Sequence, residues 1–266
     1  MGAVGVGVVC LATVFATACG SGRPTPEHPS ATRATAERPE ARPSSRTASA
    51  PAGLELRCAD PQDCPASVGM LVFAADAEPE RCTASLVGPD QILTASHCVR
   101  PTLRHAGASC RGAWVLFART GSFPARWVEC AEVVSAAPVD DAHVLRPDQA
   151  LLRLGRSVDR PALSIVPEPV EPGSIVTVVS IAPHPIYRSQ HRLSTRLCRV
   201  WTSDLAEQAL GPEASQVGWL LDCPILPGNS GSPVLDHAGH VRAIVHAGSN
   251  PGLGIGVTSP PTAAAP

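Results

Sequence analysis

The sequence contains no lysine, so all 21 of its basic residues are arginines. Aromatic residues make up only 3% of the chain, and valine, alanine, leucine and isoleucine must therefore fill any core. The formal net charge of −2 provides no basic excess, so we expect no nucleic-acid partner. No Cys-x-x-Cys motif occurs, which disfavours the competing interpretation of a zinc site, and we expect neither a metal nor another cofactor.

The N-terminal part of the chain has the composition of an export signal followed by a spacer. Residues 1–18 are small or apolar, end in Ala-Thr-Ala, and are too few to span a membrane. Because Cys19 follows directly, the segment resembles a bacterial lipoprotein signal with Cys19 as the lipidated residue; ordinary cleavage to a soluble secreted protein is the alternative. Residues 19–53, rich in Pro, Ser, Ala and Arg, predict a disordered tether that leads into a domain over residues 54–266.

Short apolar runs separated by Gly, Pro and Asp turns dominate this domain. Runs of this length and spacing predict an all-β sandwich or barrel. The only plausible short helix covers residues 203–210. The expected strands are residues 68–73, 84–87, 91–95, 113–117, 127–134, 150–154, 175–181, 197–201, 218–221, 232–235, 241–246 and 254–257.

The run Pro-Gly-Asn-Ser-Gly-Ser-Pro over residues 227–233 has the pattern of a nucleophile turn. A serine hydroxyl is a poor nucleophile at neutral pH and must be presented beside a base and backbone donors. Glycines on both sides of Ser230 permit a strained turn, and the amides of Gly228 and Ser230 could then converge on an oxyanion. Ser230 is therefore the candidate nucleophile.

Two upstream positions supply a candidate base and its partner. His97 lies in the run Thr-Ala-Ser-His-Cys over residues 94–98. Asp148 leads directly into an apolar strand through the pattern Asp-x-Ala-Leu-Leu, which favours it over the nearby Asp140 and Asp141. An acid at such a strand end can hold an imidazole in the correct tautomer. The order His, Asp, Ser differs from the Ser, Asp, His order of α/β-hydrolases.

These segments resemble the trypsin-like serine peptidases, and most closely the bacterial glutamyl-endopeptidase-like branch, around residues 82–99 and 228–234. The resemblance implies two packed six-stranded antiparallel β-barrels, over about residues 54–160 and 161–259. It also implies that His97 is the general base, Asp148 its orienting partner and Ser230 the nucleophile, with the amides of Gly228 and Ser230 as the oxyanion hole.

The resemblance extends to activation and substrate binding. Asn229 stands where animal zymogens carry an aspartate that pairs with a freed N-terminus, so we expect a domain that needs no proteolytic activation. Pro224 or Ile225 lies where trypsins place their specificity aspartate, which argues against a preference for basic residues. His246 matches a histidine of glutamyl endopeptidases, and with Ala247 and Gly248 it would line the substrate pocket; whether it recognises an acidic residue stays open at this stage.

Eight cysteines lie outside the signal and the predicted lipidation site, and an even number in an exported chain predicts disulfides. The family closes its histidine loop with the pair that corresponds to Cys82–Cys98. Proximity in the sequence then suggests Cys58–Cys64 and Cys110–Cys130, which leaves Cys198–Cys223, although other pairings of these six cysteines remain open.

Together these features predict an exported, lipid-anchored, monomeric serine endopeptidase that acts on a protein or peptide substrate. A catalytically silent protein-binding module on the same fold is the first alternative, and a carboxylesterase is the second.

Overall fold

The computed structural model describes residues 49–60, 64–73, 81–139, 148–168, 170–187, 189–201, 204, 208, 218–221, 223–249 and 253–257. Residues 46–266 form one compact unit. The predicted signal peptide, Cys19 and most of the predicted tether lie outside the described residues. Within the described ranges, no helix has the length and apolar character needed to cross a bilayer.

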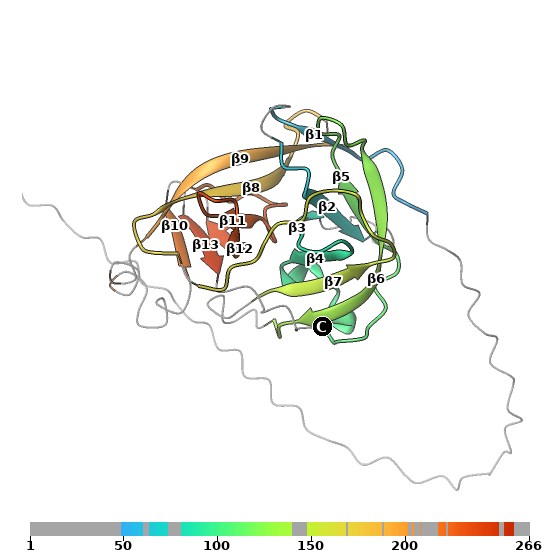
Figure 1. Cartoon of the computed structure of the whole chain (residues 1–266), viewed down its shortest axis with the longest axis horizontal. Helices are drawn as coiled ribbons and strands as arrows, with labels where there is room; N and C mark the ends of the chain where they lie inside the picture. The colour runs from blue at the N-terminus through green and yellow to red at the C-terminus, as the bar shows by residue number, and fades with distance from the viewer. Residues whose placement is uncertain are drawn as a thin grey trace, which may run out of the picture. The chain divides into compact units, whose positions relative to one another are not determined.

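The first half of the domain is a closed antiparallel barrel (Figure 1). Its strands follow one another in the order β2-β3-β4-β7-β6-β5. The six strands are β2 (Val68–Phe73), β3 (Arg81–Leu86), β4 (Gln91–Thr94), β5 (Ala113–Phe117), β6 (Arg126–Ala136) and β7 (Ala150–Leu154).

Close approach of β2 and β5 depends on a glycine. A Cβ atom at Gly69 would lie 2.7 Å from Val115 Cγ1 and 2.9 Å from the Leu116 carbonyl oxygen, which is closer than real Cβ contacts allow. Every residue of β2 is buried, because this strand faces both the barrel interior and neighbouring elements.

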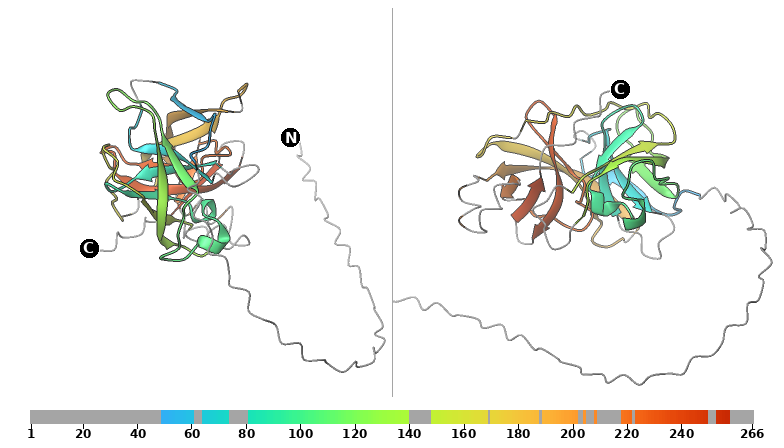
Figure 2. Two further views of the ribbon diagram at one scale, coloured as in Figure 1. Left: turned by 90° about the vertical axis from the view of Figure 1, so that its right-hand side faces the viewer. Right: turned by 90° about the horizontal axis from the view of Figure 1, so that it is seen from below.

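The second half is a seven-stranded sheet in the order β1-β9-β10-β13-β12-β11-β8, and an additional β8–β9 pairing closes six of its strands into a ring (Figure 2). The seventh, β1, runs parallel to the start of β9. The strands are β1 (Glu55–Cys58), β8 (Ile175–Pro183), β9 (Gln190–Val200), β10 (Gly218–Leu221), β11 (Pro233–Leu235), β12 (Val241–Ser249) and β13 (Leu253–Val257). The predicted all-β, two-barrel fold is thus confirmed.

Three details differ from the sequence-based expectations. β1 joins the second sheet, so the predicted range of the N-terminal barrel, residues 54–160, begins too early. Two 3-10 turns, η1 (Ser96–Cys98) and η2 (Pro101–Leu103), were not predicted. The predicted helix over residues 203–210 lies mostly outside the described residues, of which Asp204 and Gln208 are helical.

The two barrels share a hydrophobic core. One buried cluster extends from the first barrel to Ile181 of β8, Leu193 of β9 and Ile244 of β12. A smaller cluster inside the second barrel is rich in valine. β8 contributes side chains to both clusters, so this strand is packed from two sides.

Four disulfides cross-link the domain, and they are the four pairs expected above. Their Cα–Cα distances of 5.3 to 6.2 Å lie in the ordinary range for disulfides. The pairs are Cys58–Cys64, Cys82–Cys98, Cys110–Cys130 and Cys198–Cys223.

Candidate active site

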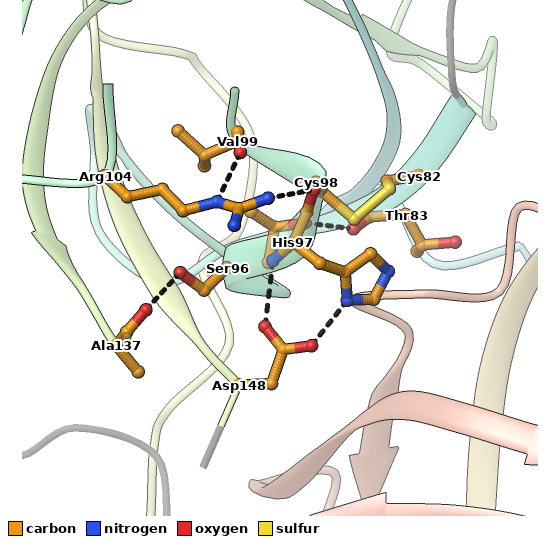
Figure 3. A network of polar contacts seen from close by, with 10 residues as sticks. Cys82, Thr83, Ser96, His97, Cys98, Val99, Arg104, Ala137 and Asp148 are labelled. Carbon is orange, nitrogen blue, oxygen red and sulfur yellow. Dashed lines mark hydrogen bonds and ion pairs between the residues drawn. A yellow bond between two sulfur atoms is a disulfide. The ribbon is translucent and has the colours of Figure 1, made fainter. Parts of the chain in front are cut away.

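His97 lies in the 3-10 turn η1, directly after strand β4 of the first barrel. Side chains on both sides hold the turn (Figure 3). The Ser96 hydroxyl donates to the Ala137 carbonyl over 2.6 Å. Arg104 donates from Nε to the Val99 carbonyl over 2.7 Å and from Nη2 to the His97 carbonyl over 3.1 Å. The backbone that carries the imidazole is therefore fixed by side-chain contacts.

Asp148 contacts His97 twice. Its Oδ2 lies 2.5 Å from His97 Nδ1, and its Oδ1 accepts the His97 backbone N–H over 2.8 Å (Figure 3). With Nδ1 facing a carboxylate, the ring proton resides on Nδ1 and the Nε2 lone pair is left to accept a proton. The contact that the predicted orienting role of Asp148 requires is therefore present. The alternatives Asp140 and Asp141 lie outside the described residues.

The environment keeps Asp148 ionised. Burial raises its pKa, but the hydrogen bonds from His97, together with the Coulombic effects of His97 and His246, outweigh burial and bring the pKa below the ordinary value. The side chain is 15% exposed. A carboxylate in this position stabilises an imidazolium without taking its proton.

The Cys82–Cys98 disulfide lies beside the base. Donor atoms of Cys82, His97 and Cys98 fall within 4.8 Å of one another, a spacing that would suit a metal ion. Because the two sulfurs are bonded to each other, neither is available as the thiolate ligand that zinc prefers. The disulfide instead ties β3 to the histidine turn.

The turn around Ser230 requires its two glycines. Gly228 has φ of +100° and Gly231 has φ of +83°, both in the region that side chains disfavour. A Cβ atom would lie 2.7 Å from the Ile181 carbonyl oxygen at Gly228, and 2.1 Å from the Thr83 carbonyl oxygen at Gly231. The turn is thus packed between the second barrel on one side and the first barrel on the other.

The backbone amides of the turn fall into two groups. The amides of Asn229, Gly231 and Ser232 donate to backbone carbonyls over 2.7 to 3.0 Å. Among the residues that the structure describes, the amides of Gly228 and Ser230 donate to no protein group. These are the two amides predicted to form an oxyanion hole, and that assignment stays a prediction.

Asn229 is 2% exposed, and its side chain bonds both the turn and β8. Its Oδ1 accepts the Leu226 N–H over 2.8 Å, and its Nδ2 donates to the Ile181 carbonyl over 2.9 Å. Both polar atoms of this side chain therefore have partners, and activity without a freed N-terminus stays a prediction.

Thr83 connects the two halves of the site. Its amide donates to the Ser230 carbonyl over 2.7 Å, and its hydroxyl donates to the Gly228 carbonyl over 2.8 Å. Sequence reasoning missed Thr83, although its place directly after Cys82 could have suggested a contact near the base. No hydrogen bond joins the side chains of Ser230 and His97 among the described residues, and such bonds are often loose before a substrate binds.

The predicted pocket residues lie on two segments of the second barrel. Pro224 and Ile225 are half-buried, and the Pro224 carbonyl accepts a bond of 3.1 Å from Arg196 Nη1. His246 is 7% exposed and sits at a β-bulge of β12, where the register with β13 shifts between Val245 and Ala247.

Gly248 lies further along β12 and pairs with Gly254 of β13. A protonated His246 would lower the pKa of Asp148. These positions are compatible with a pocket wall, and the pocket assignment itself stays a prediction.

A family model described as a trypsin-like peptidase domain matches residues 82–244, more than half of the chain. The chain belongs to the trypsin-like peptidase family. This confirms the resemblance at the level of the family, while the glutamyl-endopeptidase branch stays a prediction. No curated protein matches the sequence.

Three solved structures share the fold of this trypsin-like peptidase domain. Neuropsin, a serine protease of mouse brain, has a TM-score of 0.58 at 17% identity over 77% of this chain and 94% of its own. A protein named GrC gives 0.57 at 16% identity over 76% and 92%. An inactivated protease paralogue of the scabies mite gives 0.59 at 15% identity over 73% and 90%. Identities this low carry the fold alone.

Proposed function

We propose that this trypsin-like domain is a serine endopeptidase in which His97, Asp148 and Ser230 act together. The observation that carries the proposal is the double contact between Asp148 and His97, across the site from a turn whose Gly228 and Ser230 amides are unbonded among the described residues. An acid that fixes a base, and two donors that have no structural partner, are the parts that acyl transfer needs.

In this mechanism Ser230 Oγ attacks the scissile carbonyl while His97 Nε2 accepts its proton. The amides of Gly228 and Ser230 stabilise the oxyanion, and Asp148 stabilises the imidazolium. His97 then gives the proton to the leaving amine, which departs and leaves an acyl-enzyme. Water repeats the sequence on the ester and releases the acid.

Hydrolysis of denatured casein and of a mixed peptide library tests this proposal. The substitution Ser230→Ala should lower kcat by a factor on the order of a million, because the members of a catalytic triad act as a unit. Equal hydrolysis by the variant would refute the assignment. Cleavage of small esters without cleavage of any peptide would instead support the carboxylesterase alternative.

The silent binding module remains the competing function. The inactivated paralogue of the scabies mite indicates that proteins of this fold can lack activity. Retention of the side chains at His97, Asp148 and Ser230 argues against this alternative, and a folded wild type that cleaves nothing would favour it.

We further propose that the enzyme is exported and held at the membrane through Cys19. Four disulfides support an oxidising compartment. Cell fractionation of the wild type beside Cys19→Ala tests the anchor: the wild type should partition with membranes and the variant should not. A wild type found entirely in the soluble fraction would leave ordinary secretion.

Activity should not need proteolytic trimming, because Asn229 already has hydrogen-bond partners in its own turn and on β8. A domain that begins at residue 54 behind an unrelated tag should be active as purified. An inert protein that gains activity only after its N-terminus is trimmed would contradict this proposal.

For substrate choice we propose that His246 contributes to recognition of an acidic residue before the scissile bond. His246→Val should then reduce the preference for glutamate over glutamine in matched peptides. An unchanged ratio would remove His246 from the specificity determinants.

A further inference from the structure

We infer that the turn of the β8–β9 hairpin binds an anionic membrane surface and docks the domain beside its anchor. The hairpin tip comprises His184, Ile186, Tyr187 and Arg192, together with Arg57 of the adjoining strand β1. The inference rests on the proposed export and anchoring, and it is independent of the proposed catalysis.

Two large apolar side chains project from the hairpin tip. Ile186 is 75% exposed and Tyr187, the only tyrosine of the chain, is 55% exposed. Membrane-interface surfaces combine aliphatic and aromatic side chains of this kind, because an amphipathic ring suits the headgroup level.

Hydrogen bonds hold the backbone that carries these two side chains. His184 Nδ1 accepts the N–H groups of Ile186 and Tyr187 over 3.2 and 3.3 Å, and the rings of His184 and Tyr187 contact each other at a tilt of 36° with centroids 5.0 Å apart. Gln190 N–H donates to the Tyr187 carbonyl over 3.0 Å. Collapse of Ile186 onto the domain would break these contacts.

Two described arginines lie on the strands that lead to this turn. Arg57 and Arg192 lie directly opposite each other in the β1–β9 ladder, and Arg192 Nη2 lies 3.1 Å from His184 Nε2. The Arg57 side chain is 64% exposed and pairs with Glu55 over 2.8 Å. Long arginine stems can place their charge among anionic headgroups while apolar neighbours enter the interface.

The hairpin tip lies where the predicted tether enters the domain. Glu55 N–H, at the start of β1, donates to the Ser189 carbonyl of the same turn over 2.9 Å. Figures 1 and 2 show β1 beside this end of the hairpin. A tether of this length has an end-to-end distance of roughly 30 Å, which keeps the tip at a high effective concentration near the membrane. A weak contact therefore suffices to dock the domain.

The same hairpin provides a matched control at its other end. Leu197 is 68% exposed, comparable with Ile186, and pairs with Thr177 close to the start of β8. A separation of about six residue pairs along the ladder places it about 20 Å from the end of β8. Leu197→Ser removes an exposed side chain comparable with Ile186 from the same hairpin without changing its tip.

Vesicle sedimentation tests the inference. The chain from residue 20 onward, which lacks Cys19 and any lipid, is incubated with vesicles of phosphatidylglycerol and phosphatidylethanolamine, or of phosphatidylcholine alone. We expect the anionic vesicles to retain it at least fivefold better. The double variant Ile186→Ser, Tyr187→Ser should lose at least four fifths of that binding, whereas Leu197→Ser should stay within twofold of the wild type.

Absence of wild-type binding to anionic vesicles, or equal losses in both variants, would overturn the inference. Thermal melting of each variant establishes that it is folded. Hydrolysis of a soluble peptide distinguishes lipid binding from substrate binding by the hairpin tip. If the double variant loses hydrolysis but keeps vesicle binding, the hairpin tip contacts protein substrate rather than lipid. A wild type without peptidase activity that still binds vesicles would refute only the proposed catalysis.

Discussion

His97 and Ser230 lie on opposite sides of the site and are positioned by different kinds of contact. On the first barrel, side chains hold the base: Asp148 bonds both the ring and the backbone of His97. On the second barrel, backbone geometry holds the serine turn, with positive φ at Gly228 and Gly231. We therefore expect substitutions around His97 to abolish catalysis while the domain stays folded. Substitutions in the glycine turn should instead lower the stability of the domain.

Substitution of the acid should have the largest effect on catalysis and a small effect on folding. Asp148→Asn keeps the size of the side chain but no longer enforces the tautomer of His97, so kcat should fall by about ten-thousandfold. Steady-state kinetics measures the loss, and thermal melting should show a midpoint within a few degrees of the wild type. A decrease in kcat of less than tenfold would separate Asp148 from the base.

Substitution of the inner glycine should have the reverse effect. Gly231→Ala places a methyl group 2.1 Å from the Thr83 carbonyl oxygen at an unfavourable φ, and we expect a loss of about 4 kcal/mol in the free energy of unfolding. Gly239 is the matched control, because its φ is +82° and no atom lies within 4 Å of the position that a Cβ would occupy there. Gly239→Ala should cost about 1 kcal/mol. Equal losses in urea unfolding would refute the steric account.

The turn asparagine provides a smaller test of the same half. Asn229→Asp replaces the Nδ2 donor with an oxygen that faces the Ile181 carbonyl, in a side chain that is 2% exposed. An acceptor opposite an acceptor in a buried site should cost about 3 kcal/mol. Stability equal to that of the wild type would mean that the turn has another means of support.

The pH dependence of stability should reveal a buried histidine on the second barrel. Burial, followed by the positive charge of Arg81, lowers the pKa of His191 from 6.5 to about 4, against a smaller opposing effect of the Ser189 backbone. The unfolded chain takes up this proton at higher pH than the folded one. Stability should therefore be complete above pH 6.5 and fall by about 2 to 3 kcal/mol as the pH drops to 4.

His191→Leu should flatten this part of the pH profile in urea unfolding. The wild type measured beside it is the control, since both proteins share every other titrating group. An identical slope in the two proteins between pH 6.5 and 4 would assign the acid sensitivity to other residues.

The fold and the site were predictable from sequence to different degrees. Strands such as β2 and β5 are continuous apolar runs, and their positions follow from local sequence. β1 has no such pattern in Glu-Leu-Arg-Cys, and its parallel pairing with β9 joins residues far apart in the chain. Local patterns carry no information about a distant partner, so its sheet could not be predicted.

Within the site, the residues proposed to carry the chemistry could be singled out because each lies in a short local motif. The residues that join the halves were not. Thr83 acts through its backbone and one hydroxyl, and the bulge at His246 depends on the register of β12 against β13. Such features depend on packing between barrels, which the order of residues along one strand does not specify.

Active-site labelling with a fluorophosphonate tests the central claim most directly, because the reagent reacts with a serine only where a base and an oxyanion hole activate it. The account predicts one label per folded molecule, mapped by mass spectrometry to Ser230, no label in Ser230→Ala, and greatly slowed labelling in His97→Ala. Absence of labelling in folded wild type, or equally fast labelling of His97→Ala, would contradict the proposal that His97 and Ser230 form a working catalytic pair.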